Sequence, residues 1–306
     1  MFDARATGVY IITVTPFTDT GAIDQYSIDS MVDFYAAHGA TGLTILGIMG
    51  EAPKLTHDES VSVVTQVVRR AKIPVVVGVS APGFASMAAL SRASMDAGAA
   101  GVMIAPPPSL KTDDQIVTYY GAATEAIGVD VPFALQDHPQ ATNVVMTTGV
   151  IKRIVANNPS CVMLKHEDWP GLEKLSAIRG MISKGELREI SILCGNGGLF
   201  LAEELARGAN GAMTGYSIPE MLVSLVKLAQ SGERKQAQDL FDAHLPYLRY
   251  EQQVGVGLAA RKYVLKKRGA IKSDAQRKPM MKLSAEAIAE IEWLLARLIE
   301  QTGLKL

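Results

Sequence analysis

Cysteine is scarce in this sequence, and its placement does not suggest a disulfide. The chain has 306 residues and two cysteines, Cys161 and Cys194, both within apolar runs. This pattern is typical of buried thiols in a reducing compartment. The N-terminus shows no charged segment followed by an apolar one, and no apolar run approaches the length of about 20 residues that spans a bilayer. We therefore expect a cytoplasmic protein.

An excess of charge of either sign is also missing. The 30 basic and 31 acidic side chains give a formal net charge of -1, and no basic block stands out. These features argue against nucleic acid or an anionic membrane as a partner, and leave a small molecule as the expected one. The 48% of hydrophobic residues predicts a large core, either one big α/β domain or a domain with an appendage.

Short apolar runs alternate with helical stretches about eight times along the chain. The runs are nearly continuous, as in parallel strands covered by helices, and their spacing matches a parallel βα repeat. Eight such units in a row predict a (β/α)8 TIM barrel, an α/β fold. The expected strands are Val9–Val14, Leu43–Leu46, Val75–Val79, Val102–Ile104, Val131–Leu135, Cys161–Leu164, Ile190–Leu193 and Gly211–Met213.

The strand pattern stops after about Gln230. We therefore expect residues 1–230 to form the barrel that carries the active site, and residues 231–306 to form a C-terminal helical extension. The extension contains three helical stretches, Glu233–Tyr250, Gly255–Arg268 and Ser284–Gln301.

The sixth expected strand ends on a lysine. In a barrel of this kind, the chemistry lies at the C-terminal ends of the strands. Lys165 directly follows the apolar run Cys161–Leu164. A lysine in an apolar strand has to be paired, exposed or shifted to a lower pKa. A desolvated lysine of lowered pKa can condense with a ketone to form a Schiff base, whereas a lysine that points to solvent is the plainer alternative.

Titratable residues surround this lysine in the sequence. Alternate residues of a strand point in opposite directions, so Lys165 and Glu167 are expected to share the barrel interior, with His166 facing the helices. The fifth strand is followed by Asp137 and His138. His138 would titrate in the range that suits proton transfer at neutral pH.

The motifs, in their order and spacing, resemble the dihydrodipicolinate synthase / N-acetylneuraminate lyase family of Schiff-base barrels. Lys165 matches the family's Schiff-base lysine. The resemblance implies a pyruvate-type 2-oxo acid bound as an imine on Lys165, with no other cofactor and no metal, in a homotetramer. It covers most of the chain and rests on Val14-Thr-Pro-Phe17, Gly47-Ile-Met-Gly-Glu51, Leu55-Thr-His-Asp-Glu59, Gly78, Pro106 and the turn at Gly195.

Two departures from the family pattern affect its usual chemistry. The family's second loop reads Gly-Thr-Thr-Gly-Glu, and its hydroxyl and N–H groups hold the substrate carboxylate. Ile48 and Met49 replace the two threonines here, which leaves the backbone donors of Gly47–Glu51 as an anion nest. The tyrosine that ends the family's fifth strand and acts as general acid and base is replaced by Gln136, whose amide does not exchange protons in this way.

Further departures concern the second substrate. The arginine that the synthases carry after the fifth strand is matched by Ala141, and their aromatic pair after the fourth strand by Pro107 and Pro108. We therefore expect a lyase other than dihydrodipicolinate synthase itself, either an aldolase or a dehydratase, including a hydratase–aldolase.

The expected site combines catalytic and substrate-binding residues. Lys165 forms the imine, and His138 with Asp137 replaces the missing tyrosine in proton transfer. The expected substrate-binding residues are Gly47, Ile48, Met49, Gly50, Glu51, Gln136, Gly195, Asn196 and Met213.

Two other classes of protein stay open at this point. In a metal-dependent barrel lyase, Asp137, His138, His166 and Glu167 would supply the ligands, although adjacent residues of one strand rarely point together. A non-catalytic member that binds a 2-oxo acid as a sensor would explain the missing tyrosine and threonines. Chelator treatment separates the first class from a Schiff-base lyase, and a turnover screen separates the second.

Overall fold

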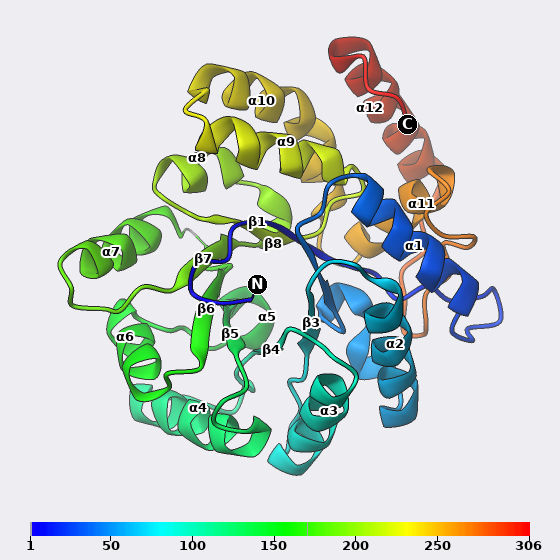
Figure 1. Ribbon diagram of the computed structural model, residues 1–306. Helices are drawn as coiled ribbons and strands as arrows, with labels where there is room; N and C mark the ends of the chain where they lie inside the picture. Colours follow the sequence, from blue (N-terminus) through cyan, green and yellow to red (C-terminus); the bar gives the residue numbers. More distant parts are fainter. Residues whose placement is uncertain (1, 170) are drawn as a thin grey trace.

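The computed structural model describes residues 2–169 and 171–306, and in this part of the chain eight parallel strands close into a barrel (Figure 1). Each strand pairs with the next in sequence, and the last pairs with the first. The predicted (β/α)8 barrel is thereby confirmed. The strands are β1 (Gly8–Ile12), β2 (Gly42–Ile45), β3 (Val75–Gly78), β4 (Gly101–Ile104), β5 (Phe133–Asp137), β6 (Cys161–His166), β7 (Ser191–Cys194) and β8 (Gly211–Thr214).

Helices form the outer layer around the strands (Figure 1). Local sequence sets several of their starts: Thr56 and Glu59 form a capping box before α2, as Thr112 and Gln115 do before α4. The short helix α5, which begins at Pro139 directly after β5, was not predicted. The barrel helices are α1 (Gln25–Ala37), α2 (His57–Arg70), α3 (Phe84–Asp96), α4 (Asp113–Ile127), α5 (Pro139–Thr142), α6 (Thr148–Asn157), α7 (Leu172–Ser183), α8 (Leu201–Ala206) and α9 (Pro219–Gln230).

Apolar side chains fill the interior of the barrel below the strand C-termini. The N-terminal segment closes the opposite end, where Phe2 and Ala6 belong to the same apolar cluster and the Ser191 hydroxyl donates to the Ala6 carbonyl. Open space is therefore left at the C-terminal ends of the strands. The strand residues of this interior cluster are Tyr10, Ile12, Val76, Met103, Ala134, Met163, Leu193 and Met213.

The C-terminal part of the chain contains the three predicted helices, α10 (Arg234–Glu251), α11 (Gly257–Lys267) and α12 (Ala285–Thr302). α10 packs against both α9 and α12. Treating residues 231–306 as a separate extension remains a prediction. None of the described helices is both long enough and apolar enough to cross a membrane.

Candidate active site

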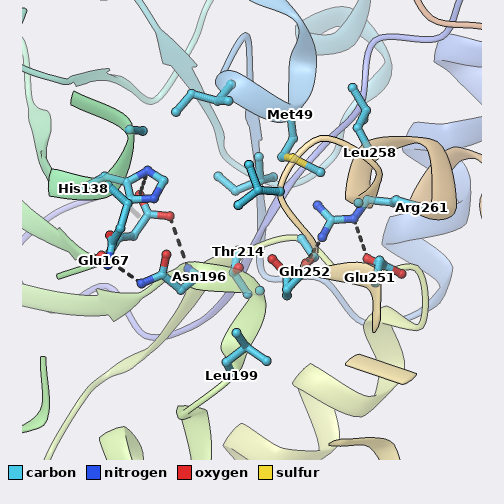
Figure 2. Close-up of a pocket in the computed structure, with 18 of the residues that line it drawn as sticks. Met49, His138, Glu167, Asn196, Leu199, Thr214, Glu251, Gln252, Leu258 and Arg261 are labelled. Carbon is cyan, nitrogen blue, oxygen red and sulfur yellow. Dashed lines mark hydrogen bonds and ion pairs between the residues drawn. The ribbon is translucent and has the colours of Figure 1, made fainter. Parts of the chain in front are cut away.

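A cavity of about 660 Å³ lies at the C-terminal ends of the strands, between two unlike walls (Figure 2). We call them the strand wall and the helical wall. Apolar residues, among them Ile12, Leu199 and Val254, line much of the remaining surface. The strand wall consists of Gln136, His138, Lys165, Glu167 and Asn196. The helical wall consists of Glu251, Gln252, Leu258 and Arg261, from the end of α10 and from α11.

Lys165 is buried at the end of β6 and paired with a carboxylate. Its side chain is only 5% exposed, and its Nζ lies 2.8 Å from Glu167 Oε2. Both side chains line the cavity, whereas His166 between them faces away and bonds the Gly171 carbonyl through Nε2 at 3.0 Å. The strand alternation thus works as predicted, and the alternative of a lysine that points to solvent is excluded.

Glu167 is the centre of the polar contacts on the strand wall. Its Oε2 accepts a hydrogen bond from Gln136 Nε2 at 2.7 Å, and its Oε1 accepts one from the Asn196 backbone N–H at 3.3 Å. The register places Gln136 of β5 directly beside Lys165 of β6. Gly195 leaves room for this carboxylate, because a Cβ there would lie 2.2 Å from Glu167 Cγ. Neighbouring strands and a glycine therefore position one carboxylate against the lysine.

The surroundings favour the ionised form of Glu167 and the neutral form of His138. Burial raises the pKa of Glu167, but the charge of Lys165 and the hydrogen bonds from Lys165 and Gln136 oppose this rise, and the net pKa lies below the usual value, so the carboxylate is ionised. Burial lowers the pKa of His138, and Glu167 offsets this only in part. His138 Nδ1 lies 3.7 Å from Glu167 Oε2. A neutral imidazole, able to accept a proton, thus stands next to the Lys165–Glu167 pair.

Asp137 lies outside the cavity, contrary to its expected catalytic role. Its side chain is fully buried on the helix side of β5, where Oδ2 is 2.6 Å from Lys174 Nζ of α7. Burial raises its pKa to about 6, although Lys174 opposes this rise. Lys174 also pairs with Asp168 at 3.0 Å. Asp137 and His138 are neighbours in sequence but point to opposite faces of the sheet, so Asp137 does not enter the proposal below.

The same alternation separates the ligands of the metal-dependent alternative. Asp137 and His166 face the helices, whereas His138 and Glu167 face the cavity. Among the residues that the structure describes, no group of three or more His, Cys, Asp or Glu side chains is arranged to hold a metal ion. The side-chain geometry therefore gives the metal-dependent class no support.

The second loop brings two apolar side chains to the cavity. Ile48 and Met49 line it from a single 3-10 turn, η1 (Ile48–Gly50). The Gly50 carbonyl accepts a hydrogen bond from the Thr15 hydroxyl at 2.6 Å, which anchors the turn. Whether the backbone N–H groups of Gly47–Glu51 bind a carboxylate stays a prediction.

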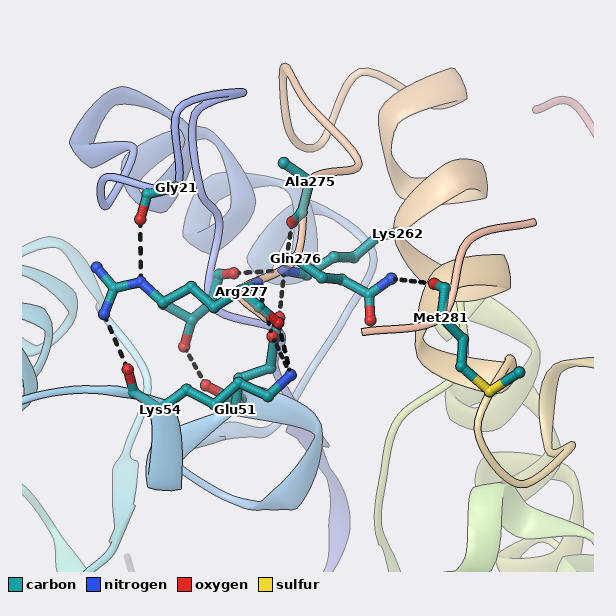
Figure 3. Close-up of polar contacts among 10 residues, drawn as sticks. Gly21, Glu51, Lys54, Lys262, Ala275, Gln276, Arg277 and Met281 are labelled. Atoms are coloured by element: carbon teal, nitrogen blue, oxygen red, sulfur yellow. Dashed lines mark hydrogen bonds and ion pairs between the residues drawn. The ribbon is translucent and has the colours of Figure 1, made fainter. Parts of the chain in front are cut away.

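Glu51 holds this loop against the C-terminal part of the chain (Figure 3). It is not among the residues that line the cavity. Its Oε1 lies 2.6 Å from Lys262 Nζ of α11, and its Oε2 lies 2.9 Å from Lys54 Nζ and 3.1 Å from the Arg277 backbone nitrogen. Met213 is also away from the cavity, fully buried in the barrel interior. Both were expected to touch the substrate, and the structure gives them structural positions instead.

The helical wall was not anticipated from the sequence. Glu251 and Arg261 are buried charged residues that line the cavity and pair with each other at 2.6 Å. Thr214, at the end of β8, also lines it. The local signal was weak, because Arg261 and Lys262 look like an ordinary solvated basic pair on a helix.

A closed parallel barrel with a buried, carboxylate-paired lysine at the end of its sixth strand has the architecture of a class I, Schiff-base lyase. Residues 5–298 match the model of the dihydrodipicolinate synthetase family. The chain therefore belongs to that family, which confirms the resemblance seen in the sequence.

Relatives of differing activity resemble the chain over 68–96% of its length. It is 29% identical over 301 residues to the L-2-keto-3-deoxyarabonate dehydratase of Azospirillum brasilense, covering 96% of this chain and 95% of that protein. It is 31% identical over 210 residues to the 4-hydroxy-tetrahydrodipicolinate synthase of Sorangium cellulosum, covering 68% and 67%. The crystal structure of a dihydrodipicolinate synthase from Rhodopseudomonas palustris is 60% identical, with a TM-score of 0.95 and coverage of 96% and 98%.

Proposed function

We propose that this protein is an aldolase or dehydratase that binds a pyruvate-type 2-oxo acid as an imine on Lys165. One observation carries the proposal: a buried lysine amine opens on a large cavity and has a carboxylate, Glu167, in direct contact. An amine becomes a nucleophile only after it loses a proton, and a contacting carboxylate is placed to take it.

Imine formation can be followed through this pair. Glu167 accepts a proton from the Lys165 ammonium, and the neutral amine attacks the C2 ketone carbon of the 2-oxo acid. The resulting carbinolamine receives a proton on its hydroxyl from Glu167, water leaves, and an iminium remains on Lys165. Glu167 ends ionised, as it began, and Gln136 holds its Oε2 in place throughout.

The iminium makes the C3 protons acidic, and His138 is our choice for the group that moves them. Its neutral imidazole takes a C3 proton, and the electron pair forms the enamine. If C4 carries a hydroxyl, that group then leaves with the His138 proton as water, which is a dehydration. If the base takes the proton of the C4 hydroxyl instead, the C3–C4 bond breaks, which is an aldol cleavage.

We propose that the reaction is not dihydrodipicolinate synthesis. The support is chemical: Gln136, Ala141 and the prolines Pro107 and Pro108 stand where the synthases have tyrosine, arginine and an aromatic pair. The synthase structure that is 60% identical favours the opposite reading, and the dehydratase relative favours ours. Turnover of a panel of 2-oxo acids, with and without aldehydes, decides between them.

Borohydride trapping tests the imine directly. Incubation with pyruvate and borohydride should add a stable mass to the peptide that carries Lys165. An adduct on Lys54 or Lys111 instead, or no adduct at all, would contradict the proposal. An adduct without turnover of any panel member would point to the non-catalytic 2-oxo acid sensor.

We also propose a cytoplasmic homotetramer. The family resemblance supports the assembly, and the free, buried Cys161 and Cys194 are consistent with a reducing compartment. Sedimentation at micromolar concentration should show a species well above the chain mass of 32.7 kDa. A single species at the chain mass would contradict the tetramer.

A further inference from the structure

The cavity is larger than a three-carbon acid on Lys165 needs. Its volume is about 660 Å³, and cavities of this size hold ligands with many more atoms than pyruvate. Figure 2 shows Arg261 of the helical wall across the cavity from His138 and Glu167 of the strand wall. A longer 2-oxo acid that is bound on the strand wall would therefore reach the helical wall with its far end.

Arg261 is a buried cation with one unpaired nitrogen. Its side chain is 2% exposed, yet it lines the cavity. Nε donates to Glu251 Oε1 at 2.6 Å, and Nη2 donates to the Gly215 carbonyl at 2.6 Å. Nη1 has no partner among the residues that the structure describes, and a Cβ at Gly215 would lie 2.3 Å from it, so the glycine leaves the space that Nη1 occupies. Leaving a charged donor unpaired is costly, and an acceptor on the ligand would remove this cost.

Gln252 is a second unpaired group of the same wall. Its side chain lines the cavity, and its Nε2 is buried without a hydrogen-bond partner in the described part of the chain. Gly197 leaves room for this amide, because a Cβ there would lie 2.1 Å from Nε2. Two unpaired donors on one wall call for hydrogen-bond acceptors, and a carboxylate brings two oxygens that only accept.

Glu251 leaves Arg261 able to attract a second anion. Its two oxygens also accept hydrogen bonds from the Ser217 backbone N–H at 3.2 Å, and Oε2 accepts one from the Tyr247 hydroxyl at 3.1 Å. Neutral donors therefore share in stabilising this carboxylate. A further carboxylate can approach Arg261 without leaving Glu251 unpaired.

We propose that the helical wall binds a second carboxylate, at the far end of the substrate, through Arg261 with Gln252 beside it. The substrate is then a 2-oxo acid with a carboxylate at each end of its carbon chain. This inference rests on the proposed function and deepens it. The C1 carboxylate stays beside Lys165, and the prediction that the second loop binds it is unaffected. Apolar lining residues such as Ile12 and Leu199 suit the carbon chain that joins the two ends.

The first test uses the parent protein alone. Borohydride trapping on Lys165 is titrated with the diacids 2-oxoglutarate, 2-oxoadipate and 2-oxopimelate, and with 2-oxo monoacids of the same chain lengths. At least one diacid should reach half-maximal trapping at a concentration roughly 10- to 100-fold below that of its monoacid, the effect of one charge-assisted hydrogen bond. Equal concentrations within every pair overturn the inference.

Variants of the helical wall then assign the preference to Arg261. Arg261→Met should abolish the preference for the diacid, and Arg261→Lys, which keeps the charge, should retain part of it. Glu251→Gln is the matched control, because it disturbs the same network but keeps the cation, so its preference should persist. The ratio within each pair cancels a general loss of affinity. A preference that Arg261→Met keeps, or that both Arg261→Met and Glu251→Gln lose equally, overturns the role of Arg261.

Failure of the proposed function would be seen separately. If the parent traps neither pyruvate nor any longer 2-oxo acid on Lys165, the imine is absent and the proposed function fails. Calorimetric titration with adipate and hexanoate, which carry no ketone, then tests the helical wall by itself. Tighter binding of adipate that is lost in Arg261→Met supports the second carboxylate site. Equal affinities for the two acids, or a preference that Arg261→Met keeps, overturn it.

Discussion

Two buried lysines, Lys165 and Lys262, differ in what surrounds them rather than in how deeply they lie. Their side chains are 5% and 0% exposed, and each contacts a glutamate, at 2.8 Å and 2.6 Å. Lys262 also donates to the carbonyls of Thr15 and Ala275, both at 2.8 Å, and its Nζ lies 4.6 Å from the Phe17 ring centroid. Its contacts leave no place for a substrate.

Lys165, in contrast, lines a cavity. Burial lowers the pKa of Lys262, and Glu51 opposes this shift, yet nothing in its position suggests reactivity. The comparison teaches that a perturbed pKa does not by itself mark a nucleophile. Access for a substrate and a carboxylate free to exchange a proton are also required.

The largest expected effect comes from removing the lysine at the cavity. Lys165→Met should abolish borohydride trapping and lower kcat by roughly 10⁴-fold or more, because the nucleophile is lost. Mass spectrometry of the trapped protein and steady-state kinetics measure both changes. A trapped adduct that persists in this variant would show that another lysine is the nucleophile. It would contradict the difference in reactivity between Lys165 and Lys262.

Neutralising the carboxylate that contacts each lysine should have very different effects on imine trapping at the two positions. Glu167→Gln keeps the size of the side chain but cannot take the lysine proton, so the rate of imine trapping and turnover should fall by roughly 10²–10⁴-fold. Glu51→Gln makes the same chemical change beside Lys262. It should leave the trapping rate near that of the parent and lower the melting temperature. Equal trapping rates in the two variants would refute a proton-transfer role for Glu167.

Removing Lys262 from its pair with Glu51 should lower the stability of the fold and leave the reaction at Lys165 unaffected. Lys262→Met leaves Glu51 buried without its closest cation, which should lower the free energy of unfolding by about 3–5 kcal/mol. Denaturant titration measures the loss, and the site of borohydride labelling should not change. Lys262→Met combined with Glu51→Leu should recover much of the stability. Without such recovery, Lys262 would stabilise the fold mainly through the carbonyls of Thr15 and Ala275.

The smallest effect concerns His138. His138→Gln should leave imine trapping on Lys165 intact while turnover falls by roughly 100-fold. Because burial holds the pKa of His138 below 6.5, kcat/KM of the parent should stay level near neutrality and fall as the pH drops through that lowered pKa. The variant should lose this limb and keep only the one below 4.5 that reflects Glu167. An unchanged pH profile would make His138 a plain loop residue.

The strand wall was largely visible in the sequence. Periodicity placed Lys165 and Glu167 on one face of a strand and His166 on the other, as the structure shows. Gln136 and His138 also line the cavity. Asp137 was misplaced because a strand end alone does not say which of two adjacent residues turns inward.

The amino-acid pattern alone was enough to predict the barrel and the position of its lysine. Parallel strands covered by helices require nearly continuous apolar runs, and a lysine that ends such a run stands out. The residues that face this lysine across the cavity could not be predicted in the same way, because they come from distant segments. Arg261 and Glu251 reach the site because α10 and α11 pack over the strand ends. The periodicity of a helix predicts which of its faces is buried, but not which segment packs against that face. Contacts between distant segments depend on packing, which local patterns do not encode.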